Sequence, residues 1–283
     1  MLSTKVSDKE FGLLNNYISK NCGITLAEDK AYLIESRLSR LLIELGLAKF
    51  EDLYTLLSQS SDKKLQEKII DAITTNETLW FRDKTPWEML KEQLLSRYIE
   101  EFRAGQRQKV RIWSAAASTG QEAYSTAMLI DQYLRQHMVA DVKLGDFEIV
   151  GTDISKTVLQ IAKAGRYDSI SIMRGLAEEY KTEYFDVQGR TWEIKESLRQ
   201  AVKFIPFNLQ ESFMGLGKFD VIFLRYVLIY FAEDLKDDIA QKCSQALAAD
   251  GALILGNSEI FGNKNGLFRQ QAFKNAVYYQ VKE

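Results

Sequence analysis

The chain has 283 residues, of which 46% are hydrophobic and 27% charged, so it can bury the core of one large domain or of two smaller ones. A formal net charge of −2 argues against general binding to nucleic acid or to an anionic membrane, both of which favour a strong basic excess. Two cysteines without metal-ligand spacing, an N-terminus unlike a signal peptide and the lack of any apolar run of about 18 residues predict a soluble, reduced, cytoplasmic protein with no metal and no membrane insertion.

The first part of the chain, residues 1–75, is predicted to be an all-α N-terminal domain. Apolar side chains recur at helical spacing in 34–45, 50–57 and 69–73, and Gly46 is placed to end the first of these helices. No proline and no alternating strand pattern interrupts them, so a small helical bundle is expected. A linker over 76–92 is expected to follow it.

The second part, residues 93–283, is predicted to be an α/β domain with a doubly wound, mostly parallel sheet. Short apolar runs alternate with helical patterns, as in βαβ units. The predicted strands are 110–117, 147–153, 219–225, 252–256 and a closing 276–281, and the predicted helices are 121–136, 155–164 and 233–248. A segment with several short β-like runs, 185–207, is predicted to be a small antiparallel insertion.

A loop of very small residues, 114–120, follows the first predicted strand and precedes a helix. In open α/β sheets, ligands bind beyond the carboxyl ends of the strands, where small residues let the ligand approach the backbone. An ordinary strand-to-helix loop can have the same composition. Neither a GxGxxG nor a GxxxxGK pattern is present, so a phosphate cradle is not indicated.

An aspartate, Asp153, ends the second predicted strand. A carboxylate in this place can accept hydrogen bonds from both hydroxyls of a ribose. Alternatively, Asp153 caps the helix that follows it. Because the small-residue loop lies one strand earlier, adenosine binding is the better interpretation of the two features together.

The junction between the two parts, 74–83, gathers polar, aromatic and guanidinium groups in ten residues. An N-cap at Asn76 or Thr78 would explain the polar residues. That alternative leaves Arg82, which is expected at the cleft between the domains, without a role.

The strand 219–225 ends at Arg225, and Tyr230 follows shortly after it. Both residues are expected at the same edge of the sheet as Asp153. A tyrosine in an apolar run is more commonly a core residue whose hydroxyl is hydrogen-bonded, so Tyr230 alone does not indicate a site.

Taken together, these segments resemble the chemotaxis receptor glutamate methyltransferase (CheR) family. The resemblance runs in order from about residue 8 to residue 280. It is carried by GITLAEDKAYLIESRLSRLLIELGL, TTNETLWFRD, SAAASTGQEAYS, GTDIS with AKAGRY, FDVIFLRYVLIYF and LILGNSE.

The resemblance implies a helical domain, a class I methyltransferase domain and a small β-subdomain. It implies S-adenosylmethionine as the cofactor, S-adenosylhomocysteine as its product, and glutamate methyl esters on chemotaxis receptors as the outcome of the reaction, which serves sensory adaptation. Arg225 and Tyr230 would line the methyl-transfer site, where Tyr230 is a predicted catalytic residue. Arg82 is the second predicted catalytic residue, whose guanidinium would hold the substrate carboxylate. Matching positions place Glu122 at the methionine amino end, Asp153 at the ribose, and Asn208 and Leu209 at the adenine. The full set implied to contact the cofactor is Asn76, Thr78, Arg82, Ala115, Glu122, Asp153, Asn208, Leu209, Arg225 and Tyr226.

Two departures from the family pattern are visible. The usual glycine and cysteine of the small-residue loop are Ala116 and Ala117, which remain small. The usual asparagine after the strand arginine is Tyr226, so a contact made by that asparagine must differ here.

A glutamate carboxylate is already ionised at neutral pH, so the implied reaction needs no general base. The single histidine, His137, accordingly lies on a helix far from every motif.

Lys30, Arg37 and Arg40 fall along one side of the helix predicted over about 29–45. The implied partners are the acidic cytoplasmic helices of methyl-accepting receptors, which these cations would complement. A solvated charged face is the alternative. The turn at 188–190 is short, so binding is expected not to depend on a receptor tether peptide. A methyltransferase acting on another protein, and a cofactor-binding regulator without turnover, remain alternative functions.

Overall fold

The computed structural model describes residues 5–60, 62–261, 266–274 and 276–282. The N-terminal part is helical, as predicted, and its buried apolar side chains form a core of their own. Its elements are α1 (Asp8–Cys22), the 3-10 helix η1 (Glu28–Lys30), α2 (Ala31–Leu45), α3 (Phe50–Gln59) and α4 (Lys63–Ile73).

Local signals set the limits of these helices. Ser7 and Glu10 form a reciprocal capping box at the start of α1. Gly46 ends α2, as predicted, because its φ of 66° is left-handed, a conformation that costs glycine little. Across the described part of the chain, no helix is both long enough and apolar enough to cross a membrane.

The α/β part is built on a mixed sheet, whose strand order over the described residues is β6-β2-β1-β7-β8-β10-β9. Strands β6, β2, β1, β7 and β8 are parallel, and β10 runs antiparallel to β8 and β9. Their bounds are β1 (Val110–Ala115), β2 (Phe147–Asp153), β6 (Val202–Pro206), β7 (Phe219–Leu224), β8 (Leu247–Leu255), β9 (Phe268–Phe273) and β10 (Ala276–Val281).

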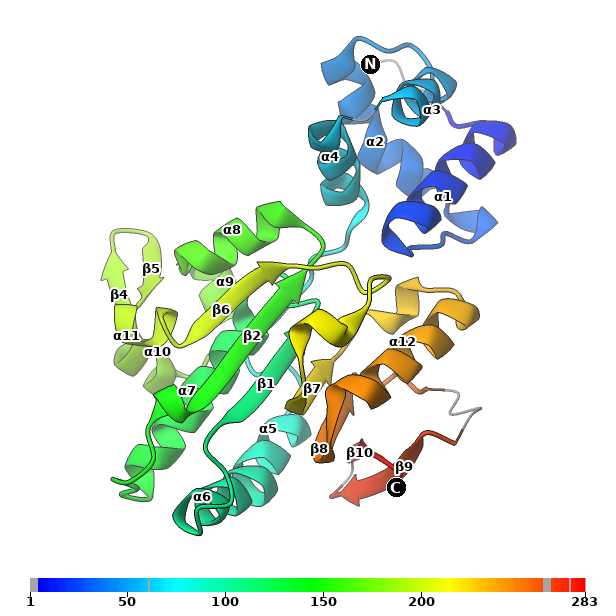
Figure 1. Cartoon of the computed structure of the whole chain (residues 1–283). Coiled ribbons are helices and arrows are strands. Elements are labelled where there is room, and N and C mark those ends of the chain that lie inside the picture. Colours follow the sequence, from blue (N-terminus) through cyan, green and yellow to red (C-terminus); the bar gives the residue numbers. More distant parts are fainter. Residues whose placement is uncertain (1–4, 61, 262–265, 275, 283) are drawn as a thin grey trace.

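Helices cover both faces of this sheet, and each face has its own buried apolar cluster. Helix α12 packs on one face and α7 on the other, with α8 beside β6 and β2 (Figure 1). The remaining elements of this layer are α7 (Gln121–Gln136), η3 (Leu144–Asp146), α8 (Lys156–Ala164), η4 (Phe213–Leu216), η5 (Leu228–Tyr230) and α12 (Glu233–Ala246).

The register of the parallel strands brings three chain segments to one edge. Ala115 of β1 pairs with Thr152 of β2 on one side and with Leu224 of β7 on the other. The residues that follow each strand therefore leave the sheet side by side. The helical domain lies beyond this edge, toward which β2 and β6 point (Figure 1).

The predicted antiparallel insertion over 185–207 is wrong in its second half. The run at 202–206 is β6, which extends the main sheet in parallel with β2. The small antiparallel sheet instead takes its third strand from before the segment, in the order β3-β5-β4. Its elements are β3 (Arg166–Asp168), α9 (Ser169–Met173), α10 (Glu178–Tyr184), β4 (Phe185–Gln188), β5 (Thr191–Ile194) and α11 (Glu196–Arg199).

The predicted linker over 76–92 is also only partly a linker. Helix begins at α5 (Thr85–Met89) and continues through the π-helical turn η2 (Leu90–Leu95) into α6 (Ser96–Arg103). Trp87 in this helix stacks on Phe223 of β7, with ring centroids 5.5 Å apart. The second half of the predicted linker is therefore core structure, and only the residues before it connect the domains.

Trp80 fixes this connecting segment to the small sheet. Its ring is 1% exposed and meets Tyr167 and Phe185 edge-on, at centroid distances of 5.0 and 5.5 Å. Its Nε1 donates to the carbonyl of Ser171 at 3.0 Å. Gly175 allows this approach, because a Cβ there would lie 2.3 Å from the Trp80 carbonyl oxygen.

Polar contacts join the helical domain to the sheet edge. Asp71 of α4 accepts hydrogen bonds from Ser155 Oγ at 2.6 Å and Thr157 Oγ1 at 2.5 Å. At a second point, Asn208 Nδ2 donates to the carbonyl of Asn21 at 2.9 Å. Ser155 and Thr157 follow β2 and Asn208 follows β6, so the helical domain is bonded to two of the segments that leave this edge of the sheet.

We expect Trp80→Ala to lower the free energy of unfolding by about 3–5 kcal/mol, because it removes a buried aromatic ring and leaves a cavity. Urea denaturation of the full chain measures this change. The control is Val187→Ala on the same small sheet, where the side chain is 54% exposed and the effect should stay within about 0.5 kcal/mol. Equal stabilities of the two variants would contradict the anchoring role.

Candidate functional site

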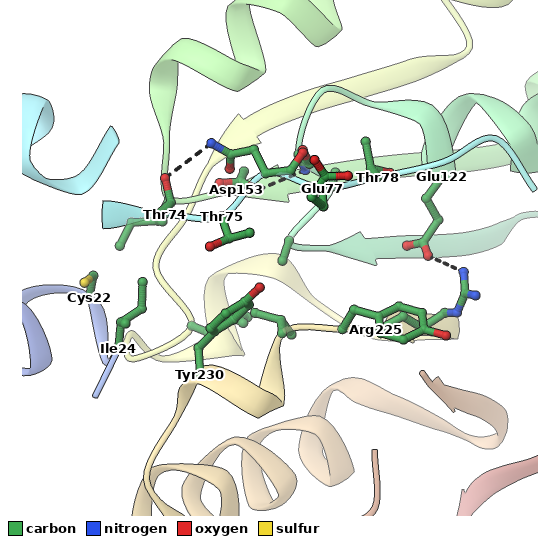
Figure 2. A pocket seen from close by; sticks show the side chains of 18 of the residues that line it. Cys22, Ile24, Thr74, Thr75, Glu77, Thr78, Glu122, Asp153, Arg225 and Tyr230 are labelled. Carbon is green, nitrogen blue, oxygen red and sulfur yellow. Dashed lines mark hydrogen bonds and ion pairs between the residues drawn. The ribbon is translucent and has the colours of Figure 1, made fainter. Parts of the chain in front are cut away.

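A cavity opens where the helical domain meets the sheet edge. It encloses about 920 Å³, part of it open to solvent. Figure 2 shows the junction residues Thr74 to Thr78 along one wall, Tyr230 facing them, and Glu122 with Arg225 at one end. The lining residues come from α1 and the loop after it, the junction, and the segments that follow β1, β2, β6 and β7.

The junction wall is held in an extended form. Residues 74–79 contain no helix, so the alternative in which Asn76 or Thr78 caps a helix is wrong. The carbonyl of Asn76 accepts from Ser118 Oγ at 2.9 Å, which joins the wall to the loop after β1. Asn76 and Thr78, both predicted to contact the cofactor, line the cavity.

The small-residue loop forms the floor. Ala116, Ala117 and Ser118 line the cavity, whereas Ala115, which was predicted to do so, is the buried last residue of β1 and is not among the lining residues. Ala116 and Ser118 have φ values of 61° and 51°. Their short side chains leave room above the strand ends.

Asp153 is almost fully buried and points its carboxylate at this floor. Oδ2 accepts from the backbone N–H of Ser118 and Oδ1 from that of Ser155, each at 2.9 Å. The cap of α8 is Ser155, not Asp153. Each carboxylate oxygen therefore has a second lone pair free of these bonds. Burial raises the pKa of Asp153 above its usual range, and the backbone N–H groups of Ser155, Ser118 and Ile154 oppose that rise.

Arg225 is the charged centre at the other end of the site. Its Nη1 donates to Glu122 Oε2 and its Nη2 to Asp83 Oδ2, both at 2.8 Å. Nη2 also donates to the carbonyl of Arg82. Within the described residues, the buried Nε of Arg225 has no partner, although Arg225 lines the cavity. The other oxygen of Glu122 is held by Ser114 Oγ at 2.8 Å.

Arg82 and Tyr226 face each other beside this centre. The guanidinium carbon of Arg82 lies 3.4 Å from the centroid of the Tyr226 ring. The Tyr226 hydroxyl donates to Asp83. The backbone N–H of Tyr226 donates to buried Glu259, which also accepts from Leu228 N at 2.8 Å.

The opposite end of the cavity is less polar. Tyr230 points into it, and Cys22 and Ile24 close it from the helical domain (Figure 2). Burial raises the pKa of the Cys22 thiol to about 11, so it is a neutral wall. Asn208 and Leu209, predicted to lie against the adenine, line this region, and the Asn208 amide is already bonded to the helical domain.

Strained backbone gathers around the cavity. The described residues include seven non-glycine positions with positive φ, a conformation that such residues rarely adopt. Five of these lie on the junction, the loop after β1 or the loop after β7, namely Phe81, Asp83, Ala116, Ser118 and Tyr226. Such strain persists where surrounding contacts fix it and is characteristic of functional sites.

The three cations predicted to bind a partner lie outside the cavity. Lys30 and Arg40 are exposed. Arg37, by contrast, donates to the carbonyl of Ile73 and to Thr75 Oγ1, the latter at 2.8 Å. It therefore holds the start of the junction wall, a role that the helical spacing of the three residues did not indicate. His137 is exposed at the end of α7 and is not a lining residue.

Several residues of the site were missed from the sequence. Cys22 and Ile24 line the cavity from the helical domain. Asp83 and Glu259 are not lining residues, but they accept hydrogen bonds that hold Arg225 and the loop after β7 in place. Asp83 lies inside the junction motif, and Glu259 ends the LILGNSE segment. A carboxylate inside each motif was therefore an available signal, but its partners come from distant segments.

The polar groups that line the cavity suit an adenosine-type ligand. Asp153 offers free lone pairs at the sheet edge, as ribose hydroxyls require. Arg225 and Glu122, which both line the cavity, place charges of both signs at one end, and these match an amino acid moiety. The alanines of the floor leave the space between them open.

Comparisons with known proteins give the family. Residues 9–74 match the family model for the CheR methyltransferase all-alpha domain, and residues 76–277 match that for the CheR methyltransferase SAM binding domain. Among curated proteins, the chain is similar to the chemotaxis protein methyltransferase Cher2 of Pseudomonas putida, with 40% identity over 96% of this chain and 98% of that protein. It is 37% identical to the chemotaxis protein methyltransferase of Vibrio anguillarum over the full length of both.

Among solved structures, a TehB-like SAM-dependent methyltransferase from Corynebacterium glutamicum matches 69% of this chain and 100% of its own, at 14% identity and a TM-score of 0.36. The two family models together span most of the sequence, and they confirm the predicted family, fold class and cofactor. The chain therefore belongs to the CheR methyltransferase family and is an S-adenosylmethionine-dependent methyltransferase of chemotaxis.

Proposed function

We propose that this enzyme methylates glutamate side chains on the cytoplasmic helices of chemoreceptors and forms methyl esters there. The observation that carries the proposal is the Arg82 guanidinium, which lines the cavity beside the cluster of Arg225 and Glu122. Within the described residues, its single hydrogen bond is a long one of 3.4 Å to the Glu77 carbonyl. Most of its donors are thus available to an incoming carboxylate.

The cofactor would lie along the floor of the cavity. We assign the ribose to Asp153, whose two fixed oxygens keep lone pairs toward the cavity. The methionine end belongs near Glu122 and Arg225, and the adenine near Leu209 at the apolar end. Asn208 supports that end from its bond to the helical domain rather than by a free amide. Asn76 and Thr78 frame the cofactor from the junction wall.

The proposed methyl transfer to a glutamate carboxylate requires no proton transfer. When bound, S-adenosylmethionine supplies a methyl group made electrophilic by its sulfonium, and the bond to sulfur breaks as the bond to the carboxylate oxygen forms. A glutamate has a pKa near ~4.3 in water and reaches the site already ionised. The residues of the chain then need to hold the carboxylate in line, and positioning of this kind can supply roughly 7–11 kcal/mol.

Arg82 and Tyr230 would do this positioning. The Arg82 guanidinium can hold one carboxylate oxygen and leave a lone pair of the other free to attack. Tyr230 faces the junction wall across the cavity (Figure 2). Its ring would pack against the reacting groups and exclude water from them.

Receptor helices would approach over the helical domain. Lys30 and Arg40 are exposed there and can meet acidic residues of the receptor. Arg37 lies between them in the sequence and is bonded to the junction wall. Substitution of Arg37 would therefore disturb the cavity as well as receptor binding. The hairpin of β4 and β5 turns through Gly189 and Arg190 alone, which favours binding without a receptor tether peptide. This substrate places the enzyme in the cytoplasm.

The test uses the full chain, labelled S-adenosylmethionine and membranes that contain chemoreceptors. The receptor band should gain label that is released by mild base, as methyl esters are. Arg82→Ala should lower kcat/KM about 100-fold, because it removes the donor that holds the substrate carboxylate. The control is Lys84→Ala in the same segment, where the side chain is 87% exposed.

Base-stable label would exclude glutamate esters and favour another protein substrate. No label, with cofactor binding retained, would favour a regulator without turnover. Near-normal turnover by Arg82→Ala, measured with the same receptor membranes, would remove Arg82 from the proposed mechanism.

Asp153→Asn should weaken binding of S-adenosylhomocysteine by roughly 10- to 100-fold, which is the loss expected for hydrogen bonds to a charged acceptor. The amide would also turn a donor toward the N–H of Ser118 or Ser155. Calorimetry on the purified chain measures the affinity. Asp186→Asn, at an exposed position of β4, serves as the control. Unchanged affinity in Asp153→Asn would exclude a ribose contact.

Joint reversal of charge by Lys30→Glu and Arg40→Glu should raise KM for receptor several-fold at low salt, with kcat and cofactor affinity unchanged. The reason is that exposed charges at an interface steer association and are screened by salt. The matched control is Lys163→Glu on the exposed side of α8. Identical KM values for the two variants would leave α2 without a role in receptor binding.

A further inference from the structure

Tyr226 stands in an unusual backbone conformation. It follows Arg225 at the end of β7, and its φ of 59° is left-handed, which is uncommon for a residue with a bulky side chain. Buried Glu259 keeps it there by accepting from the N–H groups of Tyr226, Leu228 and Gly256. Gly256 also lies so close that a Cβ would come within 3.1 Å of Tyr226 N.

The result of this conformation is the direction of the ring. The ring lies against the Arg82 guanidinium, whose central carbon is 3.4 Å from the ring centroid. Within the described residues, the only hydrogen bond that the Arg82 guanidinium donates is the long one to the Glu77 carbonyl. The tyrosine ring is therefore the main surface that limits where the guanidinium can go.

The ring is itself fixed at its far end. The Tyr226 hydroxyl donates to Asp83 Oδ2, the oxygen that also takes the ion pair from Arg225. Burial and the neighbouring Asp83 raise the pKa of Tyr226, so the phenol stays neutral and keeps this donor. Tyr226 thus contacts two adjacent residues of the junction, Arg82 through its ring and Asp83 through its hydroxyl.

We infer that Tyr226 is a positioning residue for methyl transfer, whose ring seats the Arg82 guanidinium for the substrate carboxylate and whose hydroxyl locks that seat to Asp83. The inference rests on the proposed role of Arg82. It differs from the expectation that Tyr226 contacts the cofactor, because it ties the residue to the substrate side of the reaction. Substitution should therefore affect turnover of receptor and leave cofactor affinity unchanged.

The experiment is a double-mutant cycle on the full chain with receptor membranes and labelled S-adenosylmethionine. Tyr226→Leu removes the π face and the hydroxyl, and should lower kcat/KM about 10-fold, which lies between the losses expected for an exposed and for a fully desolvated cation–π contact. In the Arg82→Ala background the same substitution should change kcat/KM less than 2-fold, because the group it positions is gone. Tyr226→Phe keeps the ring, and should stay within about 3-fold of the parent chain.

Two further measurements exclude a purely structural effect. The affinity for S-adenosylhomocysteine and the midpoint of thermal unfolding are measured for each variant. Equal losses by Tyr226→Leu in both backgrounds, or a loss of cofactor affinity that matches the loss of turnover, would overturn the inference. Near-normal turnover by Arg82→Ala alone is a different result, because it would overturn the proposed role of Arg82 and the inference together.

Discussion

The site depends on one buried cation. The Arg225 side chain is 1% exposed, and a guanidinium so placed is costly to desolvate unless carboxylates surround it. Asp83 and Glu122 supply them from the junction and from α7, at 2.8 Å each. One side chain at the end of β7 thus ties two separate segments to the sheet edge. Removal of either carboxylate would leave the buried charge of Arg225 only half compensated. Substitution of any one of the three residues should therefore destabilise the whole cluster.

That arrangement also explains why the backbone strain is tolerated. Phe81 and Asp83, the left-handed residues of the junction, flank Arg82 in the chain. Tyr226, in the loop after β7, is left-handed as well. Each conformation is fixed by contacts outside its own segment, such as the bonds of Glu259 to the loop after β7. Strain fixed from several sides is a means of pre-organisation, because the groups cannot relax away from the geometry that they present.

Sequence patterns could predict the parts of this site that follow from strand ends. Asp153 and Arg225 end buried runs of parallel strands, so both could be expected at the same edge of the sheet. What could not be predicted depends on contacts between distant segments. Arg37 has the spacing of a surface cation, yet it bonds to Thr75, 38 residues away. The run at 202–206 looks like part of a hairpin but joins β2, because pairing partners are chosen by the whole sheet and not by the local pattern.

The charges of the cavity also bear on the type of catalysis. Among the described lining residues, the Cys22 thiol is kept neutral by burial, and each of the three carboxylates, Glu77, Glu122 and Asp153, already accepts hydrogen bonds. The transfer of a methyl group to an ionised carboxylate requires no proton acceptor. In the proposed mechanism, the rate enhancement comes from positioning of the substrate carboxylate against the methyl group. The contact of the Tyr226 ring with the Arg82 guanidinium would fix one part of that geometry.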